Sequence, residues 1–206
     1  MKIVGILCEY NPFHLGHARQ ISIIRKSCGE ECAVVCLMSG NFVQRGAPAI
    51  LDKTYRAKAA ILSGADLVLE LPFPFSCPSA ESFASAGIAI LSRLGICDTL
   101  AFGTEFADLK LLSHCAQNLS TPEFESQLRE YFSHHPGSGY PAARAAVYSK
   151  LYGECPALSK PNASLAINYL LAARRQKWNP EFFAVERKGE GFHSLNKEGE
   201  LLSASA

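Results

Sequence analysis

The sequence predicts an α/β protein with a parallel, doubly wound sheet flanked by helices and with helical additions in its second half. Short apolar runs of strand length alternate with segments of helix length across the first half of the chain. Beyond residue 106 the pattern becomes mainly helical. With 206 residues, of which 48% are hydrophobic, the chain has enough apolar material for one compact core, so we expect a single domain.

Cap and turn signals delimit the elements of the first half. Asp52 is placed to cap a helix, and Gly64 follows that helix where a left-handed residue is favoured. Gly29 and Gly95 stop two further helices. In order, we expect a strand at 3–8, a helix at 14–27, a strand at 33–38, a helix from 52 to 63, a strand at 67–71, a helix at 79–94 and a strand at 99–102.

In the second half, we expect a helix to begin at Thr121, Pro122 and Glu123, which supply a capping hydroxyl, a first-turn proline and an early carboxylate. No internal repeat or low-complexity linker interrupts this part of the sequence. The remaining expected elements are a loop at 134–139, a helix at 161–177 and a last strand at 182–186.

Composition limits the classes of partner. The formal net charge is +1 and 19% of residues are charged, so any contact with RNA must come from a local patch or from another part of the protein. The N-terminal apolar run is too short for a signal peptide, and no apolar stretch approaches the ~20 residues of a membrane helix. We therefore expect a cytoplasmic protein with neither a membrane nor DNA as a partner.

The cysteines occur mostly in apolar segments, which indicates reduced and largely buried thiols. Among them, Cys28, Cys32 and Cys36 are close enough in sequence to suggest a metal site. A strand over 32–38 would separate Cys32 from Cys36 by roughly 13 Å, whereas two thiolates on one zinc ion lie within about 4 Å of each other. We expect no metal site. The eight cysteines are Cys8, Cys28, Cys32, Cys36, Cys77, Cys97, Cys115 and Cys155.

The chemistry is expected where the first strand ends, in the segment 9–17. Ligands of parallel sheets bind beyond the carboxyl ends of strands, and a helix N-terminus there suits phosphate. His14 and His17 share one face of the first turn, where they could hydrogen-bond phosphate oxygens that gain charge as pyrophosphate leaves. Gly16 removes a side chain where a nucleotide would approach the backbone. The alternatives are a zinc pair, which needs a third ligand, and two unrelated surface histidines.

Segment 9–17 resembles the His-x-Gly-His signature of the nucleotidylyltransferase superfamily. Further blocks, in family order along the whole chain, narrow the resemblance to the tRNA(Met) cytidine acetate ligase family. This resemblance implies a Rossmann-like, HUP-type nucleotidyltransferase fold, with 1–206 as its catalytic domain. The blocks are Glu-Tyr-Asn-Pro-Phe-His-Leu-Gly-His at 9–17, Met-Ser-Gly-Asn-Phe-Val-Gln-Arg-Gly at 38–46, Ala-Asp-Leu-Val-Leu-Glu-Leu-Pro at 65–72, Ser-Ala-Glu-Ser-Phe-Ala at 79–84 and Phe-Gly-Thr-Glu at 102–105.

The resemblance also implies a reaction. Acetate and ATP would give acetyl-AMP and pyrophosphate, and the acetyl group would pass to N4 of the wobble cytidine of elongator tRNA(Met). His14 and His17 would be catalytic, and Mg²⁺ is expected with ATP, held largely by phosphates and water. The implied ATP-binding residues are Leu7, Cys8, Glu9, Tyr10, Asn11, Pro12, Phe13, His14, Leu15, Gly16, His17, Ala18, Arg19, Gln20, Gly103, Asn162, Arg187 and Lys188.

Several of these positions have two interpretations. Gly103 ends a strand, where a side chain would block an adenine or a ribose. Asn162 could either cap the following helix or bind the ligand. Arg187 and Lys188 could neutralise phosphate, or they could be ordinary exposed charges.

The polar loop after the second strand lies at the same edge as the histidine segment and is long enough to suggest a function. Asn41, Gln44 and Arg45 make it rich in donors, and we expect Arg45 to approach phosphate or RNA. Beyond the loop, a cap and a solvated helix face adequately explain Asp52, Lys53 and Arg56.

The sequence departs from the family at its end. The Ser-rich segment 202–206 would continue in the family into an Ile-Arg pair that begins a second nucleotide motif, followed by a helical part that helps to hold tRNA, and neither is present here. We therefore expect ATP binding with little or no acetylation by these 206 residues. The alternative functions are a small-molecule adenylyltransferase of the pantetheine-phosphate or nicotinamide-nucleotide type, and a non-catalytic ATP-binding module.

Overall fold

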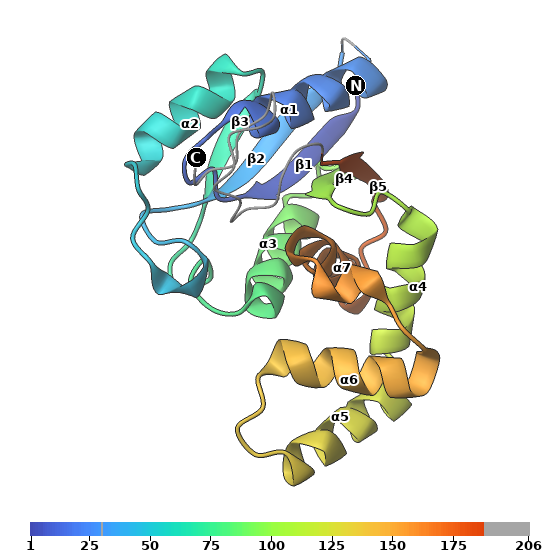
Figure 1. The fold of residues 1–206 in the computed structure, drawn as a ribbon. Helices are drawn as coiled ribbons and strands as arrows, with labels where there is room; N and C mark the ends of the chain where they lie inside the picture. Colours follow the sequence, from blue (N-terminus) through green and yellow to red (C-terminus); the bar gives the residue numbers. More distant parts are fainter. Residues whose placement is uncertain (30, 188–206) are drawn as a thin grey trace, which may run out of the picture.

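The computed structural model describes residues 1–29 and 31–187, and a five-stranded sheet lies at its centre (Figure 1). The strand order is β3-β2-β1-β4-β5 and every pairing is parallel. The order reverses between β1 and β4, which creates a topological switch point at that place. The strands are β1 (Ile3–Cys8), β2 (Ala33–Ser39), β3 (Leu67–Leu71), β4 (Thr99–Thr104) and β5 (Glu181–Glu186).

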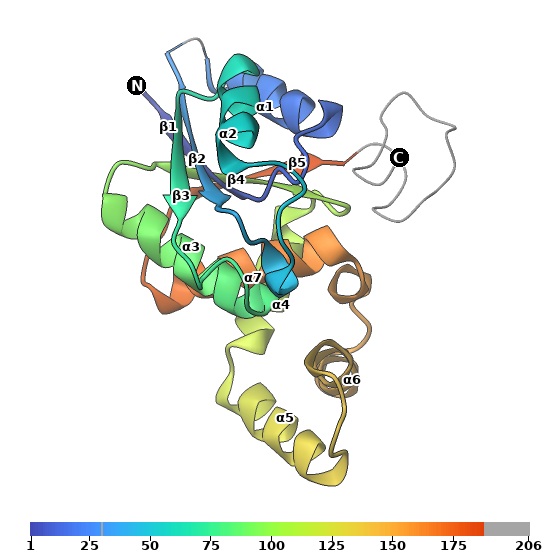
Figure 2. The ribbon, with the colours of Figure 1, turned by 90° about the vertical axis from the view of Figure 1, so that its left-hand side faces the viewer.

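Helices cover both faces of the sheet (Figure 2). Side chains of a strand alternate between the two faces, so Val4 and Ile6 pack with Ile21 of α1 on one side, whereas Leu7 lies in the core on the side of α3 and α7. The face on the first side carries α1 (Leu15–Cys28) and α2 (Lys53–Leu62), and the opposite face carries α3 (Ala80–Leu94) and α7 (Pro161–Arg175). The predicted α/β sheet is confirmed.

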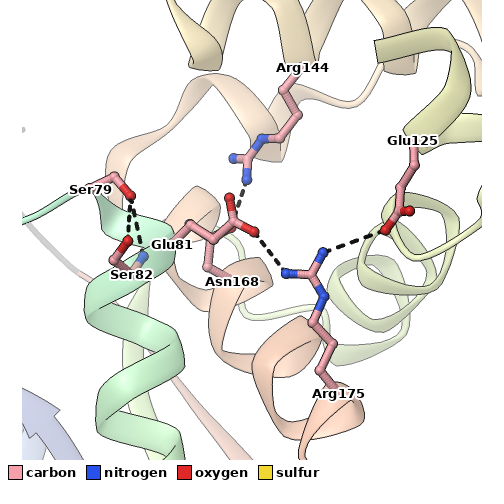
Figure 3. Close-up of polar contacts among 7 residues, drawn as sticks. All are labelled: Ser79, Glu81, Ser82, Glu125, Arg144, Asn168 and Arg175. Carbon is pink, nitrogen blue, oxygen red and sulfur yellow. Dashed lines mark hydrogen bonds and ion pairs between the residues drawn. The ribbon is translucent and has the colours of Figure 1, made fainter. Parts of the chain in front are cut away.

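The helical additions extend away from the α3 and α7 layer (Figures 1 and 2). They are joined to it by polar contacts (Figure 3): Arg144 of α6 is buried and donates to Asn168 of α7 at 2.6 Å. Arg175 of α7 forms an ion pair with Glu81 of α3 at 2.8 Å and lies 3.9 Å from Glu125 of α5. The additions are α4 (Leu109–Leu119), α5 (Pro122–His134) and α6 (Tyr140–Tyr152), and short 3₁₀ turns, η1 (Gln44–Gly46) and η2 (Pro156–Ser159), complete the described elements.

Most predicted boundaries agree with the structure to within a few residues. Asp52 caps α2 by accepting from the backbone N–H of Thr54 at 2.8 Å, as predicted. Each of the eight cysteines is buried or half-buried, as expected. None of the helices within residues 1–29 and 31–187 is long and apolar enough to cross a membrane.

Candidate active site

His14 and His17 lie at the start of α1, beyond the carboxyl end of β1. His14 is the N-cap residue, and its Nδ1 accepts from the backbone N–H of Gly16 at 3.1 Å. The Nδ1 atom of His17 accepts in return from the backbone N–H of His14 at 3.3 Å. The two rings stack with centroids 3.7 Å apart. The predicted shared face is confirmed, and the pair forms a reciprocal cap.

These hydrogen bonds determine where each imidazole carries its proton. Because both Nδ1 atoms accept, a neutral ring must carry its hydrogen on Nε2. Burial and the nearby Arg187 guanidinium lower the pKa of His14. Burial, followed by the neighbouring His14 and Arg187, lowers the pKa of His17 to about 3. At neutral pH the site therefore holds two neutral rings, each with an Nε2–H donor.

Aromatic side chains hold the ring of His17 in place. Tyr10 is buried, with its ring centroid 4.8 Å from that of His17, and Phe13 lies 5.5 Å from the same ring. Gly16 is required by the cap itself, because a Cβ at this position would lie 2.9 Å from Cε1 of His14. The structure thus gives Gly16 a second role besides the close nucleotide approach that the sequence predicts.

On the other side of the switch point, Gly103 of β4 and Arg187 lie near the histidines, and Gln20 of α1 reaches toward them. Arg187 directly follows β5, and its backbone N–H donates to the carbonyl of Thr104 at 3.0 Å. A Cβ at Gly103 would lie 3.6 Å from Cγ of Arg187 and 3.8 Å from Oε1 of Gln20, so both side chains lie next to this position near the end of β4. Arg187, whose side chain lies next to Gly103, is therefore also the residue whose charge lowers the pKa values of both histidines.

Asn162 lies in the first turn of α7, but it is not the cap, because Lys160 occupies the N-cap position. The capping interpretation of Asn162 is wrong. Its Nδ2 donates to Oε1 of Glu105 at 2.8 Å, and Glu105 follows directly after β4. Sequence reasoning gave Glu105 no role, although a carboxylate just after a strand in the block 102–105 was a usable signal.

The loop after β2 is tied to the loop after β1. The backbone N–H of Gln44 donates to Oε1 of Glu9 at 2.6 Å, and that of Ile50 donates to Oδ1 of Asn11 at 2.7 Å. The expectation that both loops lie at one edge is confirmed. Asn41, Gln44 and Arg45 belong to this loop, but the side chain of Arg45 lies outside the described part, so its approach to phosphate or RNA stays a prediction.

Arg56 corrects the interpretation of α2 as a helix with a solvated basic face. Its side chain is 1% exposed, because the guanidinium binds backbone carbonyls at the edge of the sheet instead of solvent. It donates to the carbonyl of Glu9 at 2.6 Å and to that of Ser39 at 3.1 Å. It also binds the carbonyls of Gly40 and Leu51, so one cation holds both loops together. Lys53 does lie on the surface, paired with Glu70.

The remaining predicted residues take different positions. The side chain of Leu7 packs in the core, and the half-buried Cys8 donates to the carbonyl of Leu37. Arg19 donates to the carbonyl of Glu186 at 3.0 Å and ties α1 to β5. Pro12 and Ala18 are partly exposed, Leu15 is exposed, and Lys188 lies outside the described residues.

Two buried polar atoms near these loops have no hydrogen-bond partner within the described chain. They are Oγ of Ser39, the last residue of β2, and Nε2 of Gln44 in η1. Buried polar atoms are normally paired with protein, water or ligand. Both atoms lie at the carboxyl edge of the sheet, whereas a third such atom, Oγ1 of Thr99, lies at the amino end of β4.

Paired neutral donors at a helix N-terminus, beside an arginine and at the switch point of a parallel sheet, define a nucleotidyltransferase type of site. A family model described as HIGH Nucleotidyl Transferase matches residues 1–206. The chain belongs to this family.

The relatives confirm the narrower resemblance. The tRNA(Met) cytidine acetate ligase of Syntrophotalea carbinolica is 43% identical and that of Acetivibrio thermocellus 41% identical, each over 100% of this chain but only 49% and 50% of the relative. The chain thus spans about half the length of these relatives. Apo Thermotoga maritima TmcAL superposes with a TM-score of 0.88 at 32% identity, covering 100% of this chain and 50% of that one. A second structure of that protein is bound with alpha-thio ATP, with a TM-score of 0.83 at 33% identity, covering 92% and 47%.

Proposed function

We propose that this chain binds ATP and activates acetate as acetyl-AMP, as the catalytic part of a tRNA(Met) cytidine acetate ligase. The observation that carries the proposal is the stacked pair of neutral imidazoles, His14 and His17, at the N-terminus of α1. Its specific support is the relationship to ligases of that name and to a structure bound with an ATP analogue.

In the first step, a carboxylate oxygen of acetate attacks the α-phosphorus of ATP. An O–P bond forms and the bond to pyrophosphate breaks. The Nε2–H groups of His14 and His17 donate to the phosphate oxygens, and Arg187 supplies positive charge. Charge builds up on the leaving pyrophosphate, so these hydrogen bonds strengthen most in the transition state.

In the second step, N4 of the target cytidine attacks the acetyl carbon, AMP leaves and the amine loses a proton. Elongator tRNA(Met) is the proposed acceptor, and the 1–206 domain is proposed to supply the chemistry. The charge of +1 gives little general attraction for RNA, so contacts of this domain with tRNA must be local.

We propose that Mg²⁺ accompanies ATP at this site. No group of three potential ligands among the described residues is placed to hold a metal ion. The ion would therefore be held by triphosphate oxygens and water, which Mg²⁺ accepts readily. When bound, it would neutralise phosphate charge.

Pyrophosphate exchange into ATP tests the proposal. We expect exchange that requires acetate and falls on the order of 100-fold in His17→Gln, with ATP affinity changed much less. His14→Asn keeps a side-chain acceptor for the backbone N–H of Gly16 but lacks the Nε2–H donor. A loss of exchange in this variant would therefore come from the missing donor and not from a lost helix cap. The exposed His114 on α4 provides a matched control, His114→Gln, which should exchange at the wild-type rate.

The same assay distinguishes the alternatives. Exchange that needs a phosphorylated cofactor precursor instead of acetate would identify a small-molecule adenylyltransferase. ATP binding without exchange under any of these conditions would identify a non-catalytic module. Either result would overturn the proposed acetate activation.

A further inference from the structure

The N-terminus of α7 is already occupied by a carboxylate from the protein itself. A helix N-terminus normally attracts phosphate. Here Oε1 of Glu105 accepts from the backbone N–H of Asn162 at 3.2 Å, and Oε2 accepts from that of Ala163 at 2.7 Å. Burial alone would raise the pKa of Glu105, but the hydrogen bonds from Asn162 and Ala163 outweigh it and lower the pKa. The carboxylate is therefore ionised at neutral pH.

The negative charge of Glu105 indicates which way round a bound nucleotide would lie. Phosphates placed beside Glu105 would meet a like charge and a helix end whose amides are already in use. Phosphates placed at α1 would meet the neutral Nε2–H donors of His14 and His17 and the guanidinium of Arg187. The triphosphate therefore belongs at α1, and the nucleoside end belongs beyond Gly103, toward α7.

The side chain of Asn162 suits a neutral nucleoside. Its Nδ2 is directed at Glu105, and this bond fixes which way the amide points. No hydrogen bond from residues 1–29 or 31–187 reaches its Oδ1, which leaves a carbonyl acceptor in a fixed orientation. An acceptor beside a carboxylate selects a ligand group that donates a hydrogen bond and carries no negative charge. Nucleosides present two such groups, the ribose hydroxyls and the adenine amino group.

We propose that Glu105 is a positioning residue that holds Asn162 so that its Oδ1 accepts a hydrogen bond from the nucleoside end of ATP. This inference rests on the proposed ATP site. It goes beyond that site by giving a role to Glu105, which would act on the ligand only through Asn162.

The test compares dissociation constants, measured by calorimetry, for ATP and analogues that each lack one donor. These are 2′-deoxy-ATP, 3′-deoxy-ATP and purine riboside triphosphate. For the wild type, we expect at least one analogue to bind about tenfold more weakly than ATP. In Asn162→Ala and Glu105→Gln, the dissociation constant of that analogue divided by that of ATP should fall toward one. The analogue that responds distinguishes ribose from adenine recognition.

Two controls separate positioning from general damage. Affinity for pyrophosphate, which uses only the α1 end, should change less than twofold in both variants. Glu81→Gln alters a carboxylate in the first turn of α3 that pairs with Arg175, and it should keep the wild-type ratio of dissociation constants. If Glu105→Gln does not fold, Glu105→Asp, which keeps the charge but shortens the side chain away from Asn162, takes its place in the same comparison.

The outcomes also separate this inference from the proposed function. ATP binding with equal affinities for all analogues, or with ratios unchanged in both variants, would overturn the inference alone. A loss of pyrophosphate affinity equal to the loss of ATP affinity would place phosphate at Glu105 and reverse the proposed direction. Absence of ATP binding by the wild type would overturn both proposals.

Discussion

Replacing His17 with glutamine tests whether the fold keeps this imidazole neutral. Burial, His14 and Arg187 place the pKa of His17 at about 3 in the folded protein, against 6.5 for an ordinary histidine. Above pH 6.5 the ring is neutral in both folded and unfolded chains and adds no pH dependence. As the pH falls below 6.5, the unfolded chain binds a proton that the folded protein does not. The free energy of unfolding therefore falls by about 1.4 kcal/mol per pH unit.

The magnitude follows from these two pKa values. Between pH 7 and pH 5 the full shift removes about 2 kcal/mol, and the ring of His17 keeps some contact with solvent, which reduces the effect to about 1–2 kcal/mol. Urea unfolding at both pH values should show that the wild type loses this much more stability than His17→Gln. Titrating groups that do not contact His17 are common to both proteins and cancel in the comparison.

Equal losses of stability in the wild type and in His17→Gln would refute this reasoning. The ring would then be protonated in the folded protein, or its pKa would lie near its ordinary value. A protonated His17 would need its Nδ1 as a donor, which is incompatible with the hydrogen bond from His14. The reciprocal cap and the neutral Nε2–H donors would both have to be abandoned.

Three further substitutions test other parts of the structure. Arg56→Met should lower the free energy of unfolding by about 3 kcal/mol in urea, because it leaves buried carbonyls without their donor; a loss below about 1 kcal/mol would show that they are solvated. Gly87→Ala should cost about 1–3 kcal/mol, because its Cβ would lie 2.3 Å from Cδ2 of Leu7, and a double-mutant cycle with Leu7→Ala should show strong non-additivity. Gly16→Ala should displace the His14 ring and slow acetate-dependent pyrophosphate exchange, while the free energy of unfolding changes little. A wild-type exchange rate would contradict the cap geometry.

Local patterns predicted the elements that depend on neighbouring residues. The apolar run at 3–8 becomes β1, buried between two parallel neighbours. The three-residue spacing of His14 and His17 places both rings at the start of α1, because one helical turn brings such residues together. The capping role of Asp52 follows in the same way from the residues directly after it.

Particular side-chain contacts between distant parts of the chain were not predicted. Glu105 acts on residues 57 and 58 positions further along, and no local pattern shows that contact. Arg56 was interpreted as solvated because arginine on a polar helix usually is. Arg56 lies four residues before the buried Ala60 and therefore shares the inner face of α2. There its guanidinium donates hydrogen bonds to the carbonyls of Glu9 and Ser39. Tertiary contacts, rather than helix composition, decided its environment.

Neutral imidazoles suit the proposed chemistry better than charged ones. Histidine cations would bind the triphosphate strongly before reaction and would hold pyrophosphate afterwards, so they would stabilise ground states as well as the transition state. Neutral Nε2–H donors interact more weakly with the bound nucleotide and gain most as charge moves onto the leaving group. The permanent charge comes instead from Arg187, which also helps to keep His14 and His17 deprotonated. The same arginine thus supplies the charge and maintains the protonation state that the proposed mechanism requires.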